Sequence, residues 1–399
     1  MGEMNTVPLL FTNKEDCCGC SACLNNCPKQ AISMREDEYG FLYPFINESL
    51  CIRCGKCKKV CAFQNNGTKN SPMDCYAAIN RNKNQAIKSA SGGIFAAIAE
   101  TVIKNDGIIY GAAFSGNWGV HHISVDKLED LIALQGSKYA HSEIGRIFHE
   151  VKDELQTGRQ VLFSGTPCQI DGLKAYLGEE YENLVTVDIV CHGVPSVRMF
   201  QAYLKTLEKK YGGEITSFSF RDKSIGWGKN GTVVINGKKI KIWESASSYL
   251  YYFSQGNLFR PNCYKCPYAC SNRPADLTIG DYWGIEKQHP EIFAKRGWDE
   301  TKGISLIIVN TKKGKKALEN CRSCIEVEPS SFRKISAGNK QLNHPSIDIS
   351  NGEITHEFEN GGWENVENRF RQNRGLRLYL SQIKSIIPTK LKRILKRYL

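Results

Sequence analysis

Cysteine is the residue type whose number and spacing most clearly indicate chemistry in this sequence. Seventeen of the 399 residues are cysteine, and most of them fall in clusters. A first run has the spacing C-x2-C-x2-C-x3-C-P and consists of Cys17, Cys20, Cys23 and Cys27. A second run repeats the spacing, with alanine in place of the proline, and consists of Cys51, Cys54, Cys57 and Cys61. Two-residue gaps let one loop bind three corners of a cube-shaped cluster, so the fourth ligand must come from elsewhere.

Two such runs in succession are typical of bacterial ferredoxins, in which the fourth cysteine of each run binds the other cluster. The pattern predicts one [4Fe-4S] cluster on Cys17, Cys20, Cys23 and Cys61. It predicts a second on Cys51, Cys54, Cys57 and Cys27. Structural zinc sites are the alternative, but they usually use two C-x2-C pairs for each metal, so two complete runs favour iron–sulfur clusters. Cys18 is left over, and we expect it to be a bystander.

A third group of cysteines lies further along the chain. Cys168 and Cys191 each follow a predicted strand and precede a predicted helix. The carboxyl ends of neighbouring strands meet at one edge of an open α/β sheet, where such folds bind ligands. With Cys263 and Cys266, these residues would complete a third [4Fe-4S] site. Four thiolates also suit zinc, but the upstream module favours iron–sulfur, and Cys270 is a substitute ligand or a bystander.

The elements that must position these cysteines follow from hydrophobic periodicity. We expect strands at residues 75–79, 108–114, 160–163, 184–190 and 304–310. We expect helices at residues 94–103, 126–134 and 142–155, a Lys-rich helix after residue 310, and hairpins at residues 38–44 and 235–238. The fold class is therefore α/β (α+β), with a mixed body.

Four parts of the chain are predicted from these patterns. They are a two-cluster ferredoxin domain at residues 1–66, an N-terminal part of the body at 72–160, a C-terminal part with the third cysteine group at 161–335, and a linker with a basic tail at 336–399. In the tail, apolar and basic residues fall on opposite helical faces, as in Leu391 and Leu395 against Lys392 and Lys396. Such a helix can lie on an anionic membrane surface, pack on a partner or be solvated.

Composition and charge exclude several classes of protein. The chain is 41% hydrophobic and 24% charged, which is ordinary for a globular protein, and no apolar run is long enough to span a bilayer. The net charge is +12, but residues 369–399 hold ten Lys/Arg and no Asp/Glu, so the remainder is nearly neutral. This distribution argues against a nucleic-acid partner. The first residues lack a signal-peptide pattern, so we expect a cytoplasmic protein, with peripheral membrane contact only through the tail.

Five stretches of the body together resemble a known family. They are Ser91-Gly92-Gly93, Gly136-Ser137-Lys138-Tyr139, Gly165-Thr-Pro-Cys168-Gln169, Cys191-His-Gly-Val-Pro-Ser196, and Cys263-x2-Cys266 followed by Ala275-Asp-Leu-Thr-Ile-Gly-Asp-Tyr-Trp-Gly284. In this order they resemble the beta subunits of coenzyme F(420) hydrogenases and dehydrogenases, here fused to the ferredoxin module. The resemblance implies FAD, a [4Fe-4S] cluster and hydride exchange with a deazaflavin-type coenzyme.

The non-cysteine stretches are candidate flavin-binding elements. Ser91, Gly92 and Gly93 at a helix start could present N–H groups to the FAD pyrophosphate, although serine before glycines is also an ordinary helix start. The second candidate element is Ser137, Lys138 and Tyr139, in which the lysine is either a charge near the flavin or a solvated side chain.

Several other residues have two interpretations. His192, beside a proposed ligand, is a candidate proton handler, whereas His121 and His122 are expected to be strand-surface residues. Arg221-Asp222-Lys223 with Trp227 either lines a substrate cleft or forms a charged turn. No catalytic residue is named, because a flavin would carry the hydride chemistry itself.

The sequence therefore predicts an iron–sulfur flavoprotein oxidoreductase. Electrons would pass from a two-electron carrier through FAD and three [4Fe-4S] clusters to a redox partner protein, or in reverse from ferredoxin to an organic substrate such as a polysaccharide precursor. The alternative is a non-catalytic electron-relay subunit without flavin. A zinc-stabilised interaction protein is a third hypothesis, which the two ferredoxin runs disfavour.

Overall fold

The computed structural model describes residues 6–65, 67 and 69–378. Its centre is an eight-stranded mixed sheet with the strand order β13-β3-β12-β11-β7-β6-β4-β5. In chain order the strands are β3 (Asp74–Asn80), β4 (Ile108–Phe114), β5 (Val120–Val125), β6 (Val161–Gly165), β7 (Leu184–Ile189), β11 (Leu277–Asp281), β12 (Ser305–Val309) and β13 (Ile325–Ser330). The central strands β4, β6, β7 and β11 are parallel, and the outer pairings are antiparallel.

Helices cover both faces of this sheet. One face carries α5 (Ile94–Lys104) and α12 (Lys312–Asn320), and the other carries α6 (Ile147–Gln156) and α7 (Pro167–Leu177). The two-residue period of a strand explains the division, because alternate side chains point to opposite faces. In β6, Leu162 packs in the cluster under α5, whereas Val161 and Phe163 pack in the cluster under α6 and α7.

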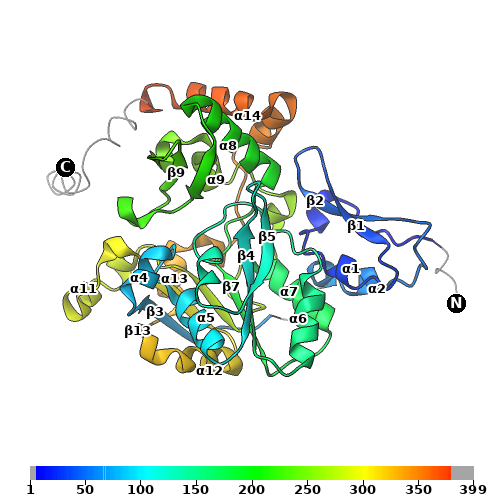
Figure 1. The fold of residues 1–399 in the computed structure, drawn as a ribbon, viewed down its shortest axis with the longest axis horizontal. Helices are drawn as coiled ribbons and strands as arrows, with labels where there is room; N and C mark the ends of the chain where they lie inside the picture. Colours follow the sequence, from blue (N-terminus) through cyan, green and yellow to red (C-terminus); the bar gives the residue numbers. More distant parts are fainter. Residues whose placement is uncertain (1–5, 66, 68, 379–399) are drawn as a thin grey trace.

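The N-terminal module lies at one end of the molecule against α6 and α7 (Figure 1). Its elements are η1 (Lys14–Asp16), α1 (Ala22–Asn25), β1 (Ile32–Glu36), β2 (Leu42–Ile46), α2 (Lys56–Lys59) and α3 (Ala62–Asn65). The hairpin β1–β2 confirms the turn predicted between the cysteine runs. Close contact with the body depends on Gly172 of α7, because a Cβ there would lie 2.8 Å from Sγ of Cys20. The ferredoxin module is thus packed directly on the body.

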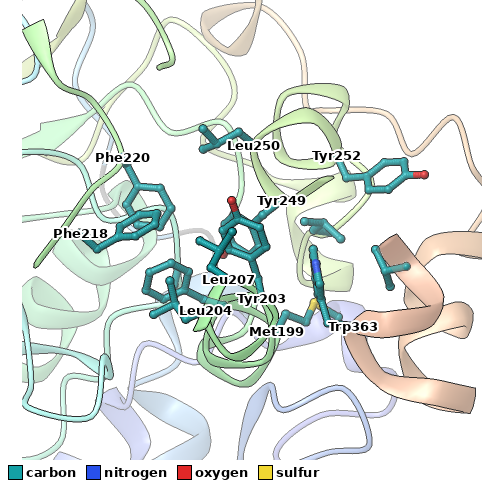
Figure 2. Packing of buried hydrophobic residues seen from close by; sticks show 14 of the residues in the cluster. Met199, Tyr203, Leu204, Leu207, Phe218, Phe220, Tyr249, Leu250, Tyr252 and Trp363 are labelled. Atoms are coloured by element: carbon teal, nitrogen blue, oxygen red, sulfur yellow. The ribbon is translucent and has the colours of Figure 1, made fainter. Parts of the chain in front are cut away.

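A second hydrophobic core lies next to the carboxyl end of β4, whose Phe114 packs against it. It joins a three-stranded sheet, β8 (Ile215–Ser219), β9 (Gly231–Ile235) and β10 (Lys238–Ile242), to α8 (Val197–Tyr211), α9 (Ser248–Gln255) and α14 (Glu353–Arg374). The aromatic rings of Tyr203, Tyr249 and Trp363 meet between the three helices (Figure 2). The remaining helices are α4 (Lys83–Lys88), α10 (Ile285–Gln288), α11 (Glu291–Arg296) and α13 (Phe332–Gly338).

Two predicted helices differ from the structure. Residues 126–134 form only the short 3-10 helix η2 (Asp130–Ala133). The helix predicted from residue 142 begins at Ile147, because the backbone of Glu143 hydrogen-bonds to Val120 and His122 of β5 instead. At Glu143, long-range pairing with a strand replaces a locally plausible helical start.

The segment predicted as a linker after residue 336 also differs. It contains α14, a helix with a kink at Gly361 and Gly362, whose buried residues include Ile354 and Val366. An apolar face that packs on α8 and α9 explains why this segment is ordered as a helix. The predicted amphipathic tail helix, with Leu391 and Leu395, lies outside the described residues. In the part of the chain that is described, no helix combines the length and hydropathy needed to cross a membrane.

Candidate functional site

The structure brings together the four cysteines that the ferredoxin pattern assigned to the first cluster. We call this set site 1; it consists of Cys17, Cys20, Cys23 and Cys61. Burial raises the pKa of Cys61 to about 11, with a further contribution from the nearby Cys20 and Cys17. Burial also raises the pKa of Cys23, whose electrostatic neighbours include Cys20, Cys17 and Cys61 of the same set. The ligands from the first run and the last cysteine of the second run are therefore neighbours in space.

The other four cysteines of the two runs line one small cavity. We call this set site 2; it consists of Cys27, Cys51, Cys54 and Cys57. Gly55, in the left-handed conformation at φ 69°, turns the chain sharply from Cys54 into α2. Cys54 is exposed and Cys57 is buried, so site 2 reaches the protein surface.

A second small cavity is lined by the third group of cysteines. We call this set site 3; it consists of Cys168, Cys191, Cys263 and Cys266. Cys168 lies in the first turn of α7, Cys191 follows β7, and the other two come from η5 (Pro261–Lys265) and the residue after it. Burial raises the pKa of Cys191 to about 12 and that of Cys266 to about 11, because the thiolate is poorly solvated there.

Cys270 is not part of site 3. Its Sγ lies 3.4 Å from the carbonyl oxygen of Pro267 and 3.3 Å from that of Asn272, and it is not among the residues that line the site 3 cavity.

Cys18, which the sequence analysis treated as a bystander, lies between sites 1 and 3. It is 4% exposed and forms part of the wall of the site 3 cavity. Its thiol contacts both Cys168 of site 3 and Cys20 of site 1, and these contacts raise its own pKa. The hydrogen bond between the thiols of Cys18 and Cys168 lowers the pKa of Cys168 to about 7. The two sites are thus separated by one side chain.

A buried ion pair supports site 3 from the side of the sheet. Arg273, 1% exposed, donates from Nη2 to Oδ1 of Asp188 at 3.1 Å and to the carbonyl of Ile189 at 3.0 Å. Asp188 belongs to β7, three residues before Cys191. The arginine therefore has a carboxylate partner within the protein.

A cavity of about 680 Å³ adjoins site 3. It opens at the carboxyl ends of β6, β7 and β11, where open α/β sheets bind ligands. Cys191, His192 and His141 belong to the walls of both this cavity and that of site 3. Its volume falls within the roughly 300–1,000 Å³ of small-molecule and cofactor sites.

Most of the candidate flavin residues line this cavity. They are Ser91, Gly93, Ser137, Lys138 and Tyr139. Gly92 does not: its N–H donates to Oγ of Ser305 at 2.9 Å, because the chain packs against β12 there. The prediction that Gly92 faces a ligand is therefore not met. The N-terminus of α5 opens into the cavity without a side-chain cap, which leaves backbone N–H groups for an anion.

Lys138 and Tyr139 are fixed on the cavity wall. The Lys138 ammonium donates to the carbonyls of Ala133 at 2.8 Å and Gln135 at 2.9 Å, and burial lowers its pKa to about 7. The Tyr139 ring stacks on Phe253 with centroids 4.2 Å apart. A lysine with this pKa can gain its proton when an anion binds beside it.

The histidines differ in their surroundings. His122 is buried rather than on the strand surface: Nδ1 lies 2.8 Å from Ser142 Oγ and Nε2 lies 3.0 Å from Ser164 O. Burial lowers its pKa to about 4, so it is neutral and structural. His192 lies between the two cavities, and its buried Nε2 has no hydrogen-bond partner in the described structure.

The charged turn after β8 also contributes to the cavity wall. Arg221 lines the cavity and pairs with Asp281 at the end of β11. Lys223 reaches back to the carbonyls of Ala86 and Ser91, and the Trp227 ring stacks on Trp283 with centroids 4.7 Å apart. The structure therefore favours the cleft interpretation for Arg221. Lys223 instead holds this turn against the segment of residues 86–91 through its two hydrogen bonds.

Two residues at the junction of the sites were missed. Arg260 lies three residues before Cys263, and His141 lies two residues after Tyr139, so only their proximity to quoted motifs could have indicated them. Within the described residues, no three Cys, His, Asp or Glu side chains converge closely enough to share one metal ion. A cube-shaped cluster binds each thiolate through a different iron.

Two family models match separate parts of the chain. Residues 16–65 match the 4Fe-4S dicluster domain, and residues 158–333 match the C terminus of the beta subunit of coenzyme F(420) hydrogenase/dehydrogenase. The first match contains sites 1 and 2, and the second contains site 3. Ser91 and Lys138 lie outside both.

Among solved structures, the chain is similar to one from the F(420)-reducing [NiFe] hydrogenase complex of Methanosarcina barkeri. The identity is 17% and the TM-score is 0.45, with 75% of this chain and 93% of that chain covered. No curated protein matches the sequence significantly.

Proposed function

We propose that this chain is an iron–sulfur flavoprotein oxidoreductase. Residues 16–65 match a 4Fe-4S dicluster domain, and residues 158–333 match the C-terminal region of coenzyme F(420) hydrogenase/dehydrogenase beta subunits. A two-electron carrier or organic substrate exchanges electrons at the large cavity. A one-electron partner protein exchanges them at site 2. Sites 3 and 1 connect these two ends.

One observation supports this proposal most: the cavity and the cysteine sites form an unbroken series. The cavity shares Cys191 and His192 with site 3. Cys18 contacts ligand positions of both site 3 and site 1. Cys23 of site 1 has Cys57 of site 2 among its electrostatic neighbours. Each step in the series is thus bridged by side chains in contact or close to it.

The donor sets fit iron–sulfur clusters. Each site offers four cysteines, the ligand set of a [4Fe-4S] cluster, and their spacing in sites 1 and 2 follows the two-cluster ferredoxin pattern. Raised thiol pKa values at Cys61 and Cys191 mean that assembly must displace protons from buried thiols. When bound, flavin and clusters would supply conversion between two-electron and one-electron transfer.

The cavity fits a dinucleotide with an anionic centre. The N-terminus of α5 would hold the pyrophosphate through its N–H groups, and Lys138 would add a positive charge when protonated. Tyr139 on Phe253 and Trp283 on Trp227 present aromatic walls against which a flat ring system could pack. The Arg221–Asp281 pair would position polar groups of a substrate.

Cofactor content is the test. The full chain is purified without oxygen, and iron, acid-labile sulfide, zinc and released flavin are measured. The proposal expects about twelve irons and one flavin for each chain, as three four-iron clusters require. About eight irons without flavin would contradict it and favour the relay subunit, and zinc at site 3 would break the electron path. Donor screening with deazaflavin, nicotinamide and ferredoxin then identifies the carrier.

A further inference from the structure

Arg260 is a fully buried cation at the junction of sites 1 and 3. Its exposed fraction is 0%, and it lies in the loop between α9 and η5. Its backbone lies next to site 3. The Arg260 N–H donates to the carbonyl of Val194, and the Arg260 carbonyl accepts a hydrogen bond from the N–H of Cys263 at 2.9 Å. Its side chain extends in the other direction, into the ferredoxin module.

The guanidinium of Arg260 is directed at site 1. Nε donates to the carbonyl of Cys17 at 2.9 Å, and Nη2 lies 3.7 Å from Sγ of the same residue. The plane of the group lies over the ring of Tyr43, with Cζ 3.9 Å from the centroid. A side chain on Gly19 would crowd it, because a Cβ there would lie 3.2 Å from Cζ.

No anion of the described protein balances this charge. Among the described residues, no carboxylate lies within 4.0 Å of Arg260, and its buried Nη1 has no hydrogen-bond partner. Arg273 at site 3 is the contrasting case, since it pairs with Asp188 at 3.1 Å. An isolated buried charge is very costly, so such a group requires a counter-charge.

We propose that Arg260 is the counter-cation of the cluster at site 1 and raises its reduction potential. The inference rests on the proposed iron–sulfur function. One electron, supplied by dithionite in the test and by the relay in the enzyme, adds one negative charge to the cluster. A buried cation beside the ligand Cys17 stabilises the reduced form more than the oxidised form, and nearby charge and hydrogen bonds to cluster sulfurs are known determinants of potential. Arg260 is thus a positioning residue for electron transfer, acting through the cluster.

The experiment is a redox titration of the anaerobically purified full chain, followed by electron paramagnetic resonance. The variants are Arg260→Gln, which removes the charge, and Arg260→Lys, which keeps it. The control is Lys265→Gln, which removes one charge at the same junction, from an exposed lysine paired with Glu15. We expect Arg260→Gln to lower the reduction potential of one cluster. At a fixed solution potential, the ratio of reduced to oxidised cluster should then fall about tenfold, which corresponds to about 59 mV for one electron. Arg260→Lys and Lys265→Gln should remain near wild type.

The shifted cluster is identified by repeating Arg260→Gln in two backgrounds. Cys54→Ser removes a ligand of site 2 and Cys263→Ser a ligand of site 3, so a shift that persists in both belongs to site 1. Unchanged potentials in iron-replete Arg260→Gln would overturn the proposal, and so would an equal shift in Arg260→Lys.

If Arg260→Gln fails to bind the site 1 cluster, Arg260→Lys decides. If Arg260→Lys keeps the iron content and the potential of the wild type, the counter-charge role is supported. If Arg260→Lys also loses the iron of site 1, the proposal is overturned. Too little iron in the wild-type chain would instead contradict the proposed function.

Discussion

Sites 2 and 3 each place four cysteines around one small cavity, yet their surroundings are opposite. Site 2 is formed within a short stretch of the module, and Cys54 is exposed. Exposed Ile52 and the exposed lysines of α2 lie next to it. Site 3 draws on three separate parts of the body, none of its cysteines is exposed, and Cys18 of the module helps to close it. The same ligand chemistry is therefore built once by local sequence and once by tertiary packing.

This difference fits the separate tasks that we propose for the two sites. An exposed site with an apolar residue and basic neighbours can meet a partner protein and steer it electrostatically. A buried site beside a 680 Å³ cavity can exchange electrons with a bound small molecule and exclude water from it. The predictions below test this contrast, starting with the largest effect.

The largest effect should come from removing ligands of one site at a time. Cys263→Ser should lower the iron content by about four, one cluster, and leave sites 1 and 2 intact. Cys54→Ser should do the same at site 2 without affecting flavin. The matched control is Cys270→Ser, whose Sγ faces backbone carbonyls and should leave the iron unchanged. Loss of four irons in the control would mean that Cys270 is the true ligand.

Charge reversal near site 2 should slow the partner protein selectively. The triple variant Lys56→Glu, Lys58→Glu, Lys59→Glu changes exposed residues of α2. We expect its reduction by an acidic ferredoxin to slow by roughly 10–100-fold at low salt, with the difference shrinking as salt rises. Stopped-flow absorbance measures this.

A control with the same change in net charge is Lys83→Glu, Lys88→Glu, Lys104→Glu, on α4 and α5. Equal slowing in both triples would show that overall charge matters and that site 2 is not the docking point.

The cavity beside site 3 should show a pH dependence that site 2 lacks. Burial lowers the pKa of Lys138 from 10.5 to about 7, so in the empty cavity it loses its proton as pH rises through 7. An anionic ligand favours the charged lysine and therefore draws in a proton above that pH. We expect the FAD affinity of flavin-depleted protein to fall by up to about tenfold between pH 6.5 and 8.5. Calorimetry in two buffers measures the proton uptake, and Lys138→Met should abolish it; a pH-independent affinity in the wild type would contradict this role.

The smallest effect concerns how the module is seated on the body. Gly172→Ala places a Cβ 2.8 Å from Sγ of Cys20 at site 1. The overlap should cost about 1 kcal/mol net, because the gain in helix propensity offsets part of it. Thermal unfolding measures the loss, and Gly116→Ala, with nothing within 4 Å, is the control. Equal stability of the two variants would mean that the module is not held closely against α7.

The sequence by itself predicted the local chemistry and the main elements. Cysteine spacing indicated which residues of the two runs belong together, because a cluster needs ligands at short, fixed gaps. Strand periodicity placed β4 at residues 108–114, as observed, and the alternation of strands and helices indicated a mixed sheet. Of residues 91–93 and 136–139, all but Gly92 line the large cavity, because the N–H of Gly92 donates to Ser305 of a distant strand instead.

Only the tertiary structure decided what lies between the sites. Cys18 was unremarkable in the sequence, yet packing of the module on α7 makes it the contact between sites 1 and 3. Arg260 is a single arginine 243 positions from Cys17, and no local pattern connects the two. The helix α14 was missed as well, because its stability comes from an apolar face buried on α8 and α9. Contacts between distant segments depend on how preformed surfaces fit together, and periodicity and spacing carry no record of that fit.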